Sequence, residues 1–332
     1  MSKVRVAILG TGGIANHHMN QFKLHPDVEM VALCDVVPTQ VQAFCDRHFA
    51  TAAKKPACYT DAAKMYKEAK PDAISICTPH TQHYEQALQA LKAGCHILME
   101  KPMVTDLKQA VDLEKRVKKS GKIFVVGYNT PCSVEFKKIR DLVRSGEYGK
   151  LKIVNIFISQ RWYQGTKGKW RQEPELSGGG MAYDSGAHVL NSLVWTVEAD
   201  VAEVFAWTDN LDSKVDINSS INVRFANGVC ATVGICGEAP SGSYGAWIFE
   251  NALVETNPWG AGWIKIQDTK GMVKYPKMEG TDFTPMFNFI ESILGRDTPR
   301  TSPKNGVQQS QLMDAIYESA RTGKPARPPK VK

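Results

Sequence analysis

The chain has 332 residues, 43% of them hydrophobic and 23% charged, and its formal net charge is +7. This length suffices for two domains, because single hydrophobic cores rarely grow beyond about 250 to 300 residues. No apolar run reaches the roughly 18 residues of a membrane-spanning helix, so we expect no membrane partner.

The positive charge is spread along the chain rather than gathered on one element. Lysines recur in several helical patterns, for example in "LEKRVKKSGK" at residues 113–122. Nucleic-acid binding concentrates basic side chains on one surface, so we expect no nucleic-acid partner.

The eight cysteines show no C-x-x-C spacing, and several lie inside apolar runs, as reduced thiols do. The chain also enters an apolar strand within its first ten residues, which leaves no room for a signal peptide. These features predict a cytoplasmic location. His17 and His18 have no cysteine or carboxylate at metal-ligand spacing, so we expect surface or packing roles for them and no metal site.

Up to residue 127, short apolar strands alternate with helical patterns. In the segment 81–94, for example, Ala87, Leu88 and Leu91 recur at helical spacing. Continuous apolar strands joined by helices are typical of a parallel sheet covered on both faces. We therefore predict an α/β fold for residues 1–127, a Rossmann-type doubly wound parallel sheet that binds NAD. Its expected strands are residues 4–9, 28–34, 73–77, 96–100 and 123–127.

After residue 150 the connections between strands become too short for crossover helices. Asn227-Gly228 is a strong hairpin signal between two of these strands. We predict an α+β domain over residues 128–332, with a mainly antiparallel open sheet, for substrate binding and oligomerisation. A cleft between the two domains is the expected substrate site. The expected strands are residues 151–160, 201–207, 217–226, 229–236 and 263–267, and the expected helices are 283–294 and 303–321, the latter with Pro303 at its first position.

The segment "AILGTGGIANHH" carries the glycine pattern of a dinucleotide-binding loop. Gly10, Gly12 and Ala15 form G-x-G-x-x-A between the first strand and a helix. Gly10 permits the tight turn, Gly12 lets the backbone approach a pyrophosphate, and the helix N-terminus faces the anion. Asp35 ends the second strand, where a carboxylate binds the ribose diol and repels a 2'-phosphate. No lysine or arginine follows before Arg47, so we predict NAD rather than NADP.

Two more segments carry candidate catalytic groups. Lys101 follows the strand 96–100 in "EKP", at the edge where parallel sheets bind ligands, although a sheet-capping ion pair is an equally good explanation of that motif alone. Asp184 and His188 stand four residues apart at the start of a helix, so both lie on one face of it. The three glycines before them, residues 178–180, indicate a backbone that passes close to something flat or bulky. A histidine paired with an aspartate is typical of a base and its orienting group.

The chain resembles the glucose-fructose oxidoreductase, inositol dehydrogenase and MocA family along essentially its whole length. The resemblance implies that Lys101 polarises the reacting oxygen, that His188 removes the hydroxyl proton, and that Asp184 holds His188 and binds the substrate. Two positions depart from the family pattern: His80 stands where asparagine is common, and Thr130 where arginine is common. The matching segments are "AILGTGGIA", Asp35, "CTPHTQHYEQALQALKAGCHILMEKP", "GYN", "SGEYGKL", "GKWRQEPELSGGGMAYDSGAH" and "AIYESARTGKP".

These motifs and the resemblance together assign residues to the cofactor and to the substrate. The aromatics of the segment 161–176 are expected to pack on sugar rings, with anchoring of a long loop as the alternative. The predicted cofactor contacts are Gly10, Thr11, Gly12, Gly13, Ile14, Asp35, Thr78, Pro79, His80, His83, Glu100, Lys101, Asn129, Trp170 and Arg171. The predicted substrate contacts are Lys101, Tyr128, Arg161, Trp162, Tyr163, Asp184 and His188.

A second aromatic cluster, Trp259 and Trp263, is a candidate contact with a neighbouring subunit, and we expect a homo-oligomer, either a dimer, a tetramer or a larger assembly. The first functional hypothesis is an NAD-dependent dehydrogenase that oxidises a secondary ring hydroxyl of a sugar, glycoside or cyclic polyol, with C3 of a glucoside as one candidate. The second is a redox-neutral glycosidase or epimerase-like enzyme with tightly bound, internally recycled NAD. The third, a non-catalytic NAD-binding regulator, is disfavoured by the Lys101, Asp184 and His188 group.

Overall fold

The structure is a computed structural model that describes residues 3–259, 262–280 and 283–331. The chain divides into two compact units, and each is built from three separate segments of the sequence. The first unit consists of Met1–Val104, Lys108–Gly127 and Phe283–Lys304. The second consists of Thr105–Leu107, Tyr128–Asp282 and Asn305–Lys332.

The first unit is built on a parallel sheet in the order β3-β2-β1-β4-β5-β6. This is the strand order of dinucleotide-binding doubly wound folds, so the predicted fold class of this part is confirmed. The sequence did not predict β3, which has only three residues and no buried apolar run to mark it. The strands are β1 (Val4–Leu9), β2 (Val28–Cys34), β3 (Ala57–Tyr59), β4 (Ala73–Ile76), β5 (His96–Met99) and β6 (Phe124–Val126).

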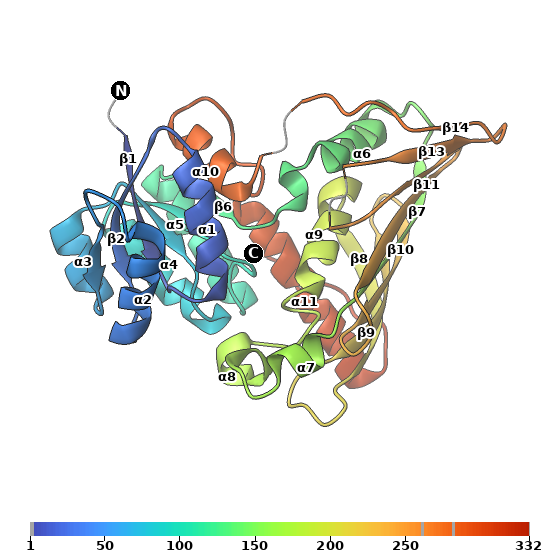
Figure 1. Ribbon diagram of the computed structural model, residues 1–332. Coiled ribbons are helices and arrows are strands. Elements are labelled where there is room, and N and C mark those ends of the chain that lie inside the picture. The colour runs from blue at the N-terminus through green and yellow to red at the C-terminus, as the bar shows by residue number, and fades with distance from the viewer. Residues whose placement is uncertain (1–2, 260–261, 281–282, 332) are drawn as a thin grey trace. The chain divides into compact units, whose positions relative to one another are not determined.

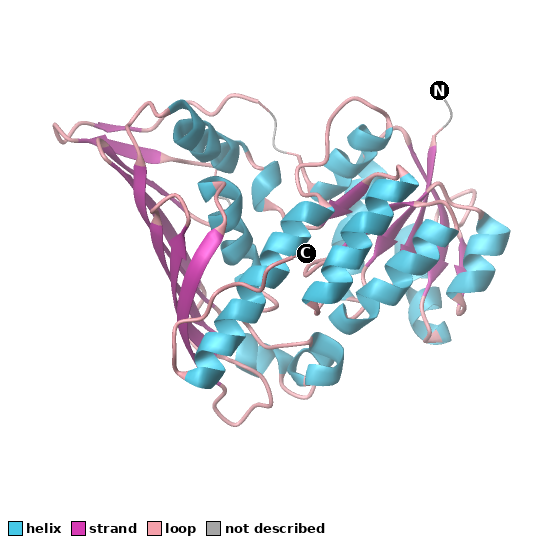
Figure 2. Cartoon of the chain, turned by 180° about the vertical axis from the view of Figure 1, so that it is seen from behind, coloured by secondary structure: helices cyan, strands magenta, loops and turns pink. Residues whose placement is uncertain are grey.

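Helices cover both faces of this sheet (Figures 1 and 2). Their buried faces are short and apolar, as in α1, where Ala15, Met19 and Phe22 recur at helical spacing and join the core with Ile8. Asp61 caps α3 by accepting from the Lys64 backbone N–H at 2.8 Å. The helices are α1 (Gly13–Leu24), α2 (Pro38–Phe49), α3 (Ala62–Ala69), α4 (His83–Lys92) and α5 (Leu107–Ser120).

The helix α10 (Pro285–Ile293) returns to the first unit from a late part of the chain. Sequence reasoning grouped this segment with the second domain. Met286, Phe289 and Ile290 pack instead into the core of the parallel sheet, because their apolar stripe finds its partner there.

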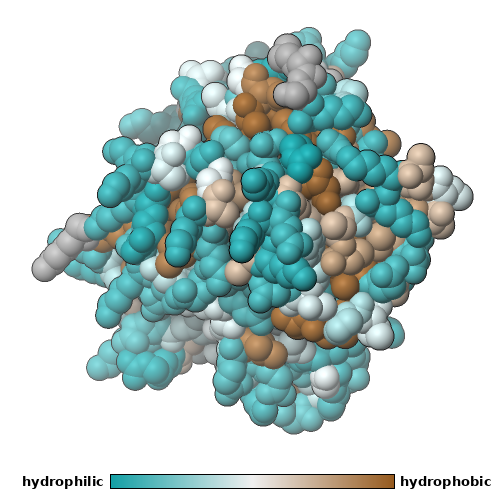
Figure 3. All heavy atoms as spheres, turned by 90° about the vertical axis from the view of Figure 1, so that its left-hand side faces the viewer, coloured by the Kyte–Doolittle hydropathy of each residue, from teal (hydrophilic) through white to brown (hydrophobic). Residues whose placement is uncertain are grey.

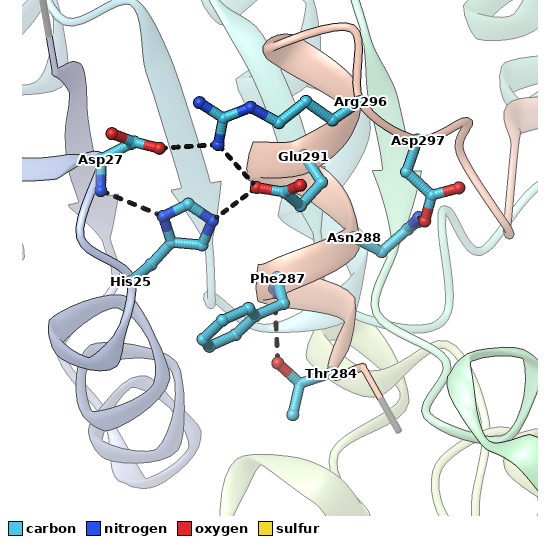
Figure 4. A network of polar contacts seen from close by, with 8 residues as sticks. All are labelled: His25, Asp27, Thr284, Phe287, Asn288, Glu291, Arg296 and Asp297. Atoms are coloured by element: carbon cyan, nitrogen blue, oxygen red, sulfur yellow. Dashed lines mark hydrogen bonds and ion pairs between the residues drawn. The ribbon is translucent and has the colours of Figure 1, made fainter. Parts of the chain in front are cut away.

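Figure 4 shows the polar network that fastens α10 to the segment between α1 and β2. His25 Nε2 lies 3.1 Å from the Glu291 carboxylate, and His25 Nδ1 accepts from the Asp27 backbone N–H at 3.2 Å. Arg296 pairs with Asp27 at 2.7 Å and with Glu291 at 3.2 Å. His25, Asp27 and Glu291 lie close enough together to hold a metal ion. The Arg296 guanidinium already neutralises both carboxylates, which disfavours a cation there.

The second unit contains a sheet in the order β14-β13-β12-β11-β7-β10-β9-β8. All neighbouring pairs are antiparallel except β7 and β10, which run parallel, so the prediction of a mainly antiparallel sheet is confirmed. The strands are β7 (Leu151–Ser159), β8 (Val201–Asp209), β9 (Asn218–Phe225), β10 (Cys230–Cys236), β11 (Gly242–Phe249), β12 (Ala252–Thr256), β13 (Lys265–Asp268) and β14 (Val273–Lys274).

The predicted hairpin joins β9 and β10 through Asn227-Gly228, with Gly228 at φ +87°. The strand β11 was not predicted, because Gly242 and Gly245 depress strand propensity. Gly245 has a packing reason, since a side chain there would press on the buried Trp247 ring at 2.8 Å.

The helices α6 (Val134–Ser145), α9 (Gly186–Val197) and α11 (Pro303–Thr322) lie on the same side of this sheet (Figure 1). They fill the core from that side with residues such as Phe136, Leu190 and Leu312. On the opposite side large apolar residues are exposed, including Ile153 and Trp207. The helices of this unit are α6 (Val134–Ser145), α7 (Trp162–Thr166), α8 (Pro174–Ser177), α9 (Gly186–Val197) and α11 (Pro303–Thr322).

The visible surface in Figure 3 is mostly hydrophilic, and hydrophobic residues form scattered patches between charged ones. Within residues 3–259, 262–280 and 283–331, every helix is too short or too polar to cross a membrane.

Candidate active site

The turn after β1 has the geometry of a phosphate loop. Gly10 has φ +87°, and a side chain there would lie 2.9 Å from the backbone of Cys77, so glycine is required. A Cβ atom added to Gly12 or Gly13 would have no other atom within 4 Å, so the space beside these two residues is open. The helix α1 begins at Gly13 without a side-chain cap, which leaves its positive end suited to an anion.

Asp35 ends β2 beside this loop and is 8% exposed. Its Oδ2 accepts from Thr11, through both the backbone N–H at 2.8 Å and the hydroxyl at 3.0 Å, and from Gln40 at 2.9 Å. Its Oδ1 accepts from the Val37 N–H at 3.0 Å, and a carboxylate oxygen has room for a second donor. The next side chain, Val36, is 84% exposed and apolar, so it offers nothing to a 2'-phosphate. This arrangement fits an adenosine ribose with a free diol.

The segment after β4 holds four predicted cofactor residues. Thr78 and Pro79 form the turn, His80 is 3% exposed, and His83 begins α4 and is fully buried. His83 Nε2 lies 3.1 Å from the Thr78 carbonyl oxygen, and its Nδ1 lies 2.8 Å from the Pro102 carbonyl oxygen. His83 therefore bridges the turns that follow two neighbouring strands.

Lys101 lies in the turn that follows β5, and the Lys101–Pro102 peptide bond is cis. Glu100 Oε2 accepts from the backbone N–H of Lys101 at 3.2 Å. Glu100 Oε1 lies 2.7 Å from His18 Nε2, and His18 Nδ1 lies 2.8 Å from the Ser75 hydroxyl. Sequence reasoning expected a surface or packing role for His18, and it could not detect the contact with Glu100, which lies 82 residues away along the chain.

The buried His18 carries a charge. Burial by itself opposes that charge, but the Cys77 thiol and the Glu100 carboxylate outweigh burial and raise the pKa of His18 to about 10. The imidazolium donates from both nitrogens, which matches the two acceptors that face it. His18 and Glu100 thus form a buried ion pair directly behind the Lys101 turn.

In the second unit, the predicted catalytic aspartate lies just before α9 and is 5% exposed. Asp184 Oδ2 accepts from the indole N–H of Trp162 at 2.8 Å and from Arg171 Nε at 2.9 Å. Trp162 was predicted to face substrate and Arg171 to face the cofactor. In the structure both side chains donate to the Asp184 carboxylate, which they orient and which the guanidinium neutralises.

His188 lies in the first turn of α9 between two aromatic rings. The Tyr128 ring meets it edge-on at a centroid separation of 6.0 Å, and the Trp259 ring lies 4.8 Å away. Trp259 was a candidate subunit contact in the sequence, whereas in the structure it packs on the predicted base of its own chain. No local signal marked this contact, because 71 residues of chain separate Trp259 from His188.

The loop that begins at Arg161 divides into exposed and anchored residues. Arg161 is exposed. Tyr163 is 8% exposed, and its hydroxyl donates to Asp212. The Arg171 guanidinium lies 4.4 Å from the centre of the Trp170 ring. The Tyr163 hydrogen bond ties the loop to the protein itself, as expected if these aromatic residues anchor a long loop rather than pack on sugar rings.

The three glycines before Asp184 pass close to the protein itself. A side chain on Gly180 would overlap the backbone of Asp216, and one on Gly179 would overlap the Tyr317 hydroxyl. The Asp216 carboxylate accepts from the backbone N–H groups of Gly180 and Ala182, both at 2.8 Å, and from Tyr317 at 2.6 Å. Asp216 is therefore a residue that sequence reasoning missed, and it shapes the segment that leads into α9.

The remaining predicted residues lie near these groups. Ile14 is 39% exposed in the first turn of α1. Asn129 is exposed next to the buried Tyr128. Thr130, one of the departures from the family pattern, accepts from the Ser192 hydroxyl on α9 at 2.8 Å. The structure thus places the predicted residues in two regions, with Gly10, Asp35 and Lys101 in the turns that follow strands of the parallel sheet and with Asp184 and His188 at the start of α9.

Comparison with known proteins identifies two family segments. Residues 4–128 match the model described as "Oxidoreductase family, NAD-binding Rossmann fold", and residues 136–267 match the GFO/IDH/MocA C-terminal domain.

Two relatives and one solved structure illustrate the similarity. The chain is 30% identical to D-glucoside 3-dehydrogenase of Escherichia coli K12 over 197 residues, which cover 59% of this chain and 54% of the relative. It is 28% identical to inositol 2-dehydrogenase/D-chiro-inositol 3-dehydrogenase of Lactiplantibacillus plantarum, over 60% of this chain and 54% of the relative. The chain thus spans about half the length of these relatives.

The fold is similar to that of aldose-aldose oxidoreductase from Caulobacter crescentus, with a TM-score of 0.85 at 20% identity, covering 98% of this chain and 99% of that one. The two family segments cover most of both units. The protein belongs to the GFO/IDH/MocA family of oxidoreductases with an NAD-binding Rossmann fold.

Proposed function

We propose that the protein is an NAD-dependent dehydrogenase that oxidises a secondary ring hydroxyl of a sugar, glycoside or cyclic polyol. The observation that carries the proposal is the pairing of Asp184 with Trp162 and Arg171, one helical turn before His188. A carboxylate held by two donors beside a helix-borne histidine is suited to moving a proton. The first unit contributes the phosphate loop, Asp35 and Lys101.

In the proposed reaction the three catalytic residues have different tasks. His188 takes the proton of the reacting hydroxyl, since an imidazole titrates near neutral pH. Lys101 supplies positive charge where negative charge develops on the oxygen. Asp184 orients His188 and binds a substrate hydroxyl. NAD, when bound, accepts the hydride from the carbinol carbon.

The cofactor contacts follow from the first unit. Gly10, Gly12 and Gly13 would hold the pyrophosphate at the start of α1. The backbone is accessible there, because glycine has no side chain and no other atom lies within 4 Å of the place that a Cβ of Gly12 or Gly13 would take. Asp35 would bind the ribose diol through Oδ1. Thr78, Pro79 and His80 would line the path toward the nicotinamide, and the proposal needs no metal ion.

The substrate class rests on the family and on the names of the relatives. D-Glucoside 3-dehydrogenase and inositol 2-dehydrogenase both act on ring-borne hydroxyls according to their names. We propose a glucoside, oxidised at C3, as the first substrate to test. Arg161 is exposed and offers hydrogen bonds to hydroxyl groups. A cytoplasmic location agrees with the eight free cysteines.

The experiment mixes the purified full chain with NAD and a panel of free sugars, inositols and aryl or C-linked glycosides. Accumulation of NADH with one class supports the proposal and names the class. Cleavage of a glycoside without net NADH identifies the redox-neutral alternative with recycled NAD. Absence of both with every member of the panel contradicts the proposed function.

The same assay tests the roles of individual residues. His188→Ala should lower kcat by at least about 100-fold at neutral pH, because general-base catalysis contributes about 10²- to 10⁴-fold. Near wild-type turnover of this variant would remove His188 from its role.

A further inference from the structure

The turn that carries Lys101 is held on both sides by buried histidines from different elements. His18, on α1, is 1% exposed and contacts Glu100, the residue before Lys101. His83, on α4, is fully buried and contacts Pro102, the residue after Lys101. Neither histidine has a chemical task in the proposed reaction.

The contact on the first side runs through the Glu100 carboxylate. His18 Nε2 lies 2.7 Å from Oε1, and Oε2 accepts from the Lys101 backbone N–H at 3.2 Å. A side chain on Gly127 would lie 3.0 Å from Oε1, so glycine at that position leaves room for the carboxylate. Ser75 holds the other nitrogen of His18 at 2.8 Å. The orientation of the His18 ring is therefore determined at both nitrogens.

The contact on the second side is a direct bond to the backbone. His83 Nδ1 lies 2.8 Å from the Pro102 carbonyl oxygen, and Nε2 lies 3.1 Å from that of Thr78. Burial lowers the pKa of His83, although the two carbonyl groups oppose that effect, so the ring is neutral and has one N–H group. We assign the hydrogen to Nδ1, which makes the shorter of the two contacts and then donates to the Pro102 carbonyl oxygen.

We propose that His18 and His83 are positioning residues that clamp the backbone on either side of Lys101 and so determine where its ammonium group lies. The proposal rests on the catalytic role proposed for Lys101. A lysine has a flexible four-carbon stem, so its place in a reaction depends on a rigid backbone beneath it. A displacement of about 1 Å can cost about 100-fold in rate.

The two clamps use opposite ring nitrogens, which gives a sharp test. A glutamine amide nitrogen occupies the place of histidine Nε2, and an asparagine amide nitrogen occupies that of Nδ1. His18→Gln should keep the bond to Glu100, and His18→Asn should lose it. At position 83 the order reverses, because His83→Asn should keep the bond to Pro102 and His83→Gln should lose it.

The kinetic readout separates positioning from simple structural damage. His18→Asn and His83→Gln should lower kcat at least about 10-fold, with KM and the Kd for NAD changed less than about threefold. His18→Gln and His83→Asn should retain most of the wild-type kcat. His96, at the opposite end of β5, accepts from the Ile123 N–H at 2.9 Å and provides the control, since His96→Gln should leave kcat unchanged.

Hydrogen exchange of the unliganded protein tests the clamp without any reaction. The amides of residues 99–104 should exchange at least about tenfold faster in His18→Asn and His83→Gln than in wild type. If exchange follows this order while the wild type oxidises no substrate, the clamp is supported and the proposed function fails. The clamp would be overturned if both of these variants kept the wild-type exchange rates and the wild-type kcat. It would also be overturned if the same substitution, either Asn or Gln, preserved kcat at both positions.

Discussion

The indole N–H of Trp162 donates to Oδ2 of Asp184 at 2.8 Å, and Trp162 is itself 6% exposed. A buried donor to a carboxylate contributes about 1.5 to 3 kcal/mol, because the bond is charge-assisted and the alternative leaves a polar group unsatisfied. The role proposed for Asp184 therefore predicts that the Trp162 ring influences the reaction through this bond, without touching the substrate.

Trp162→Phe keeps most of the ring and removes the N–H group. We expect kcat to fall about tenfold or more, with an unchanged Kd for NAD, measured by steady-state kinetics and calorimetry. Trp207→Phe is the matched control, since Trp207 is 57% exposed on the second sheet and should have no effect. A Trp162→Phe enzyme with wild-type kcat would show that the bond does not matter for the reaction.

Cofactor choice should depend on Asp35 and on Val36 beside it. Replacing both, as Asp35→Ser with Val36→Arg, removes the charge that repels a 2'-phosphate and adds one that attracts it. The ratio of kcat/KM with NAD to kcat/KM with NADP should fall by about 100-fold or more. Val36→Arg alone should give a smaller change, and an unchanged ratio in the double variant would refute the role of Asp35.

Gly180 should tolerate no side chain. Gly180→Ala would force the added methyl group into the Asp216 backbone. The free energy of unfolding, measured by urea titration, should therefore fall by about 3 kcal/mol. Gly165→Ala is the control, since open space surrounds that position and stability should change by less than about 0.5 kcal/mol. Equal stability of the two variants would contradict the close approach of the two segments.

The contribution of Asp314 to the stability of the protein should fall as pH rises through the range where this carboxyl group ionises. Burial and the nearby Asp106 raise the pKa of Asp314 to about 6 from an ordinary value of 3.8. The folded state binds this proton more tightly than the unfolded chain, so stability is lost between about pH 4 and pH 6 and stays lower above.

Asp314→Asn removes that loss, because an amide does not ionise. We expect this variant to gain about 1 kcal/mol at pH 7.5, less than the full shift implies because solvent screens a half-buried group. The gain should disappear below about pH 4, as measured by urea titrations at several pH values. A gain that does not depend on pH would point to another cause.

The outer face of the second sheet should be buried in a homo-oligomer. Ile153, Phe157 and Trp207 are 42%, 45% and 57% exposed, and Phe157 contacts the Tyr244 ring at a centroid separation of 6.4 Å. Exposed apolar surface of this kind is typical of subunit interfaces. Light scattering should show an assembly for the wild type and smaller particles for Phe157→Lys. Leu24→Lys, on the first unit, should leave the mass unchanged, and a monomeric wild type would contradict the prediction.

Local signals in the sequence were enough for the parts of the fold that depend on short stretches. The strand Val4–Leu9 and the helix that begins at Pro303 were predicted with their observed starts. The phosphate loop was recognisable because Gly10 must adopt a positive φ and only a few residue types can follow it. Lys101, Asp184 and His188 could be proposed as a catalytic group because their spacing and neighbours form recognisable motifs, and that assignment stays a prediction.

Tertiary structure decided which residues support those motifs. The sequence could not reveal that His18 bonds to Glu100, that Trp162 bonds to Asp184, or that Gly180 lies against Asp216, because 82, 22 and 36 residues of chain separate these pairs. The sequence also could not assign α10 to the first unit. The apolar stripe of an amphipathic helix indicates that the helix packs on an apolar surface, but it does not indicate which surface. Periodicity and motif spacing describe neighbours along the chain, whereas burial and hydrogen bonding depend on neighbours in space.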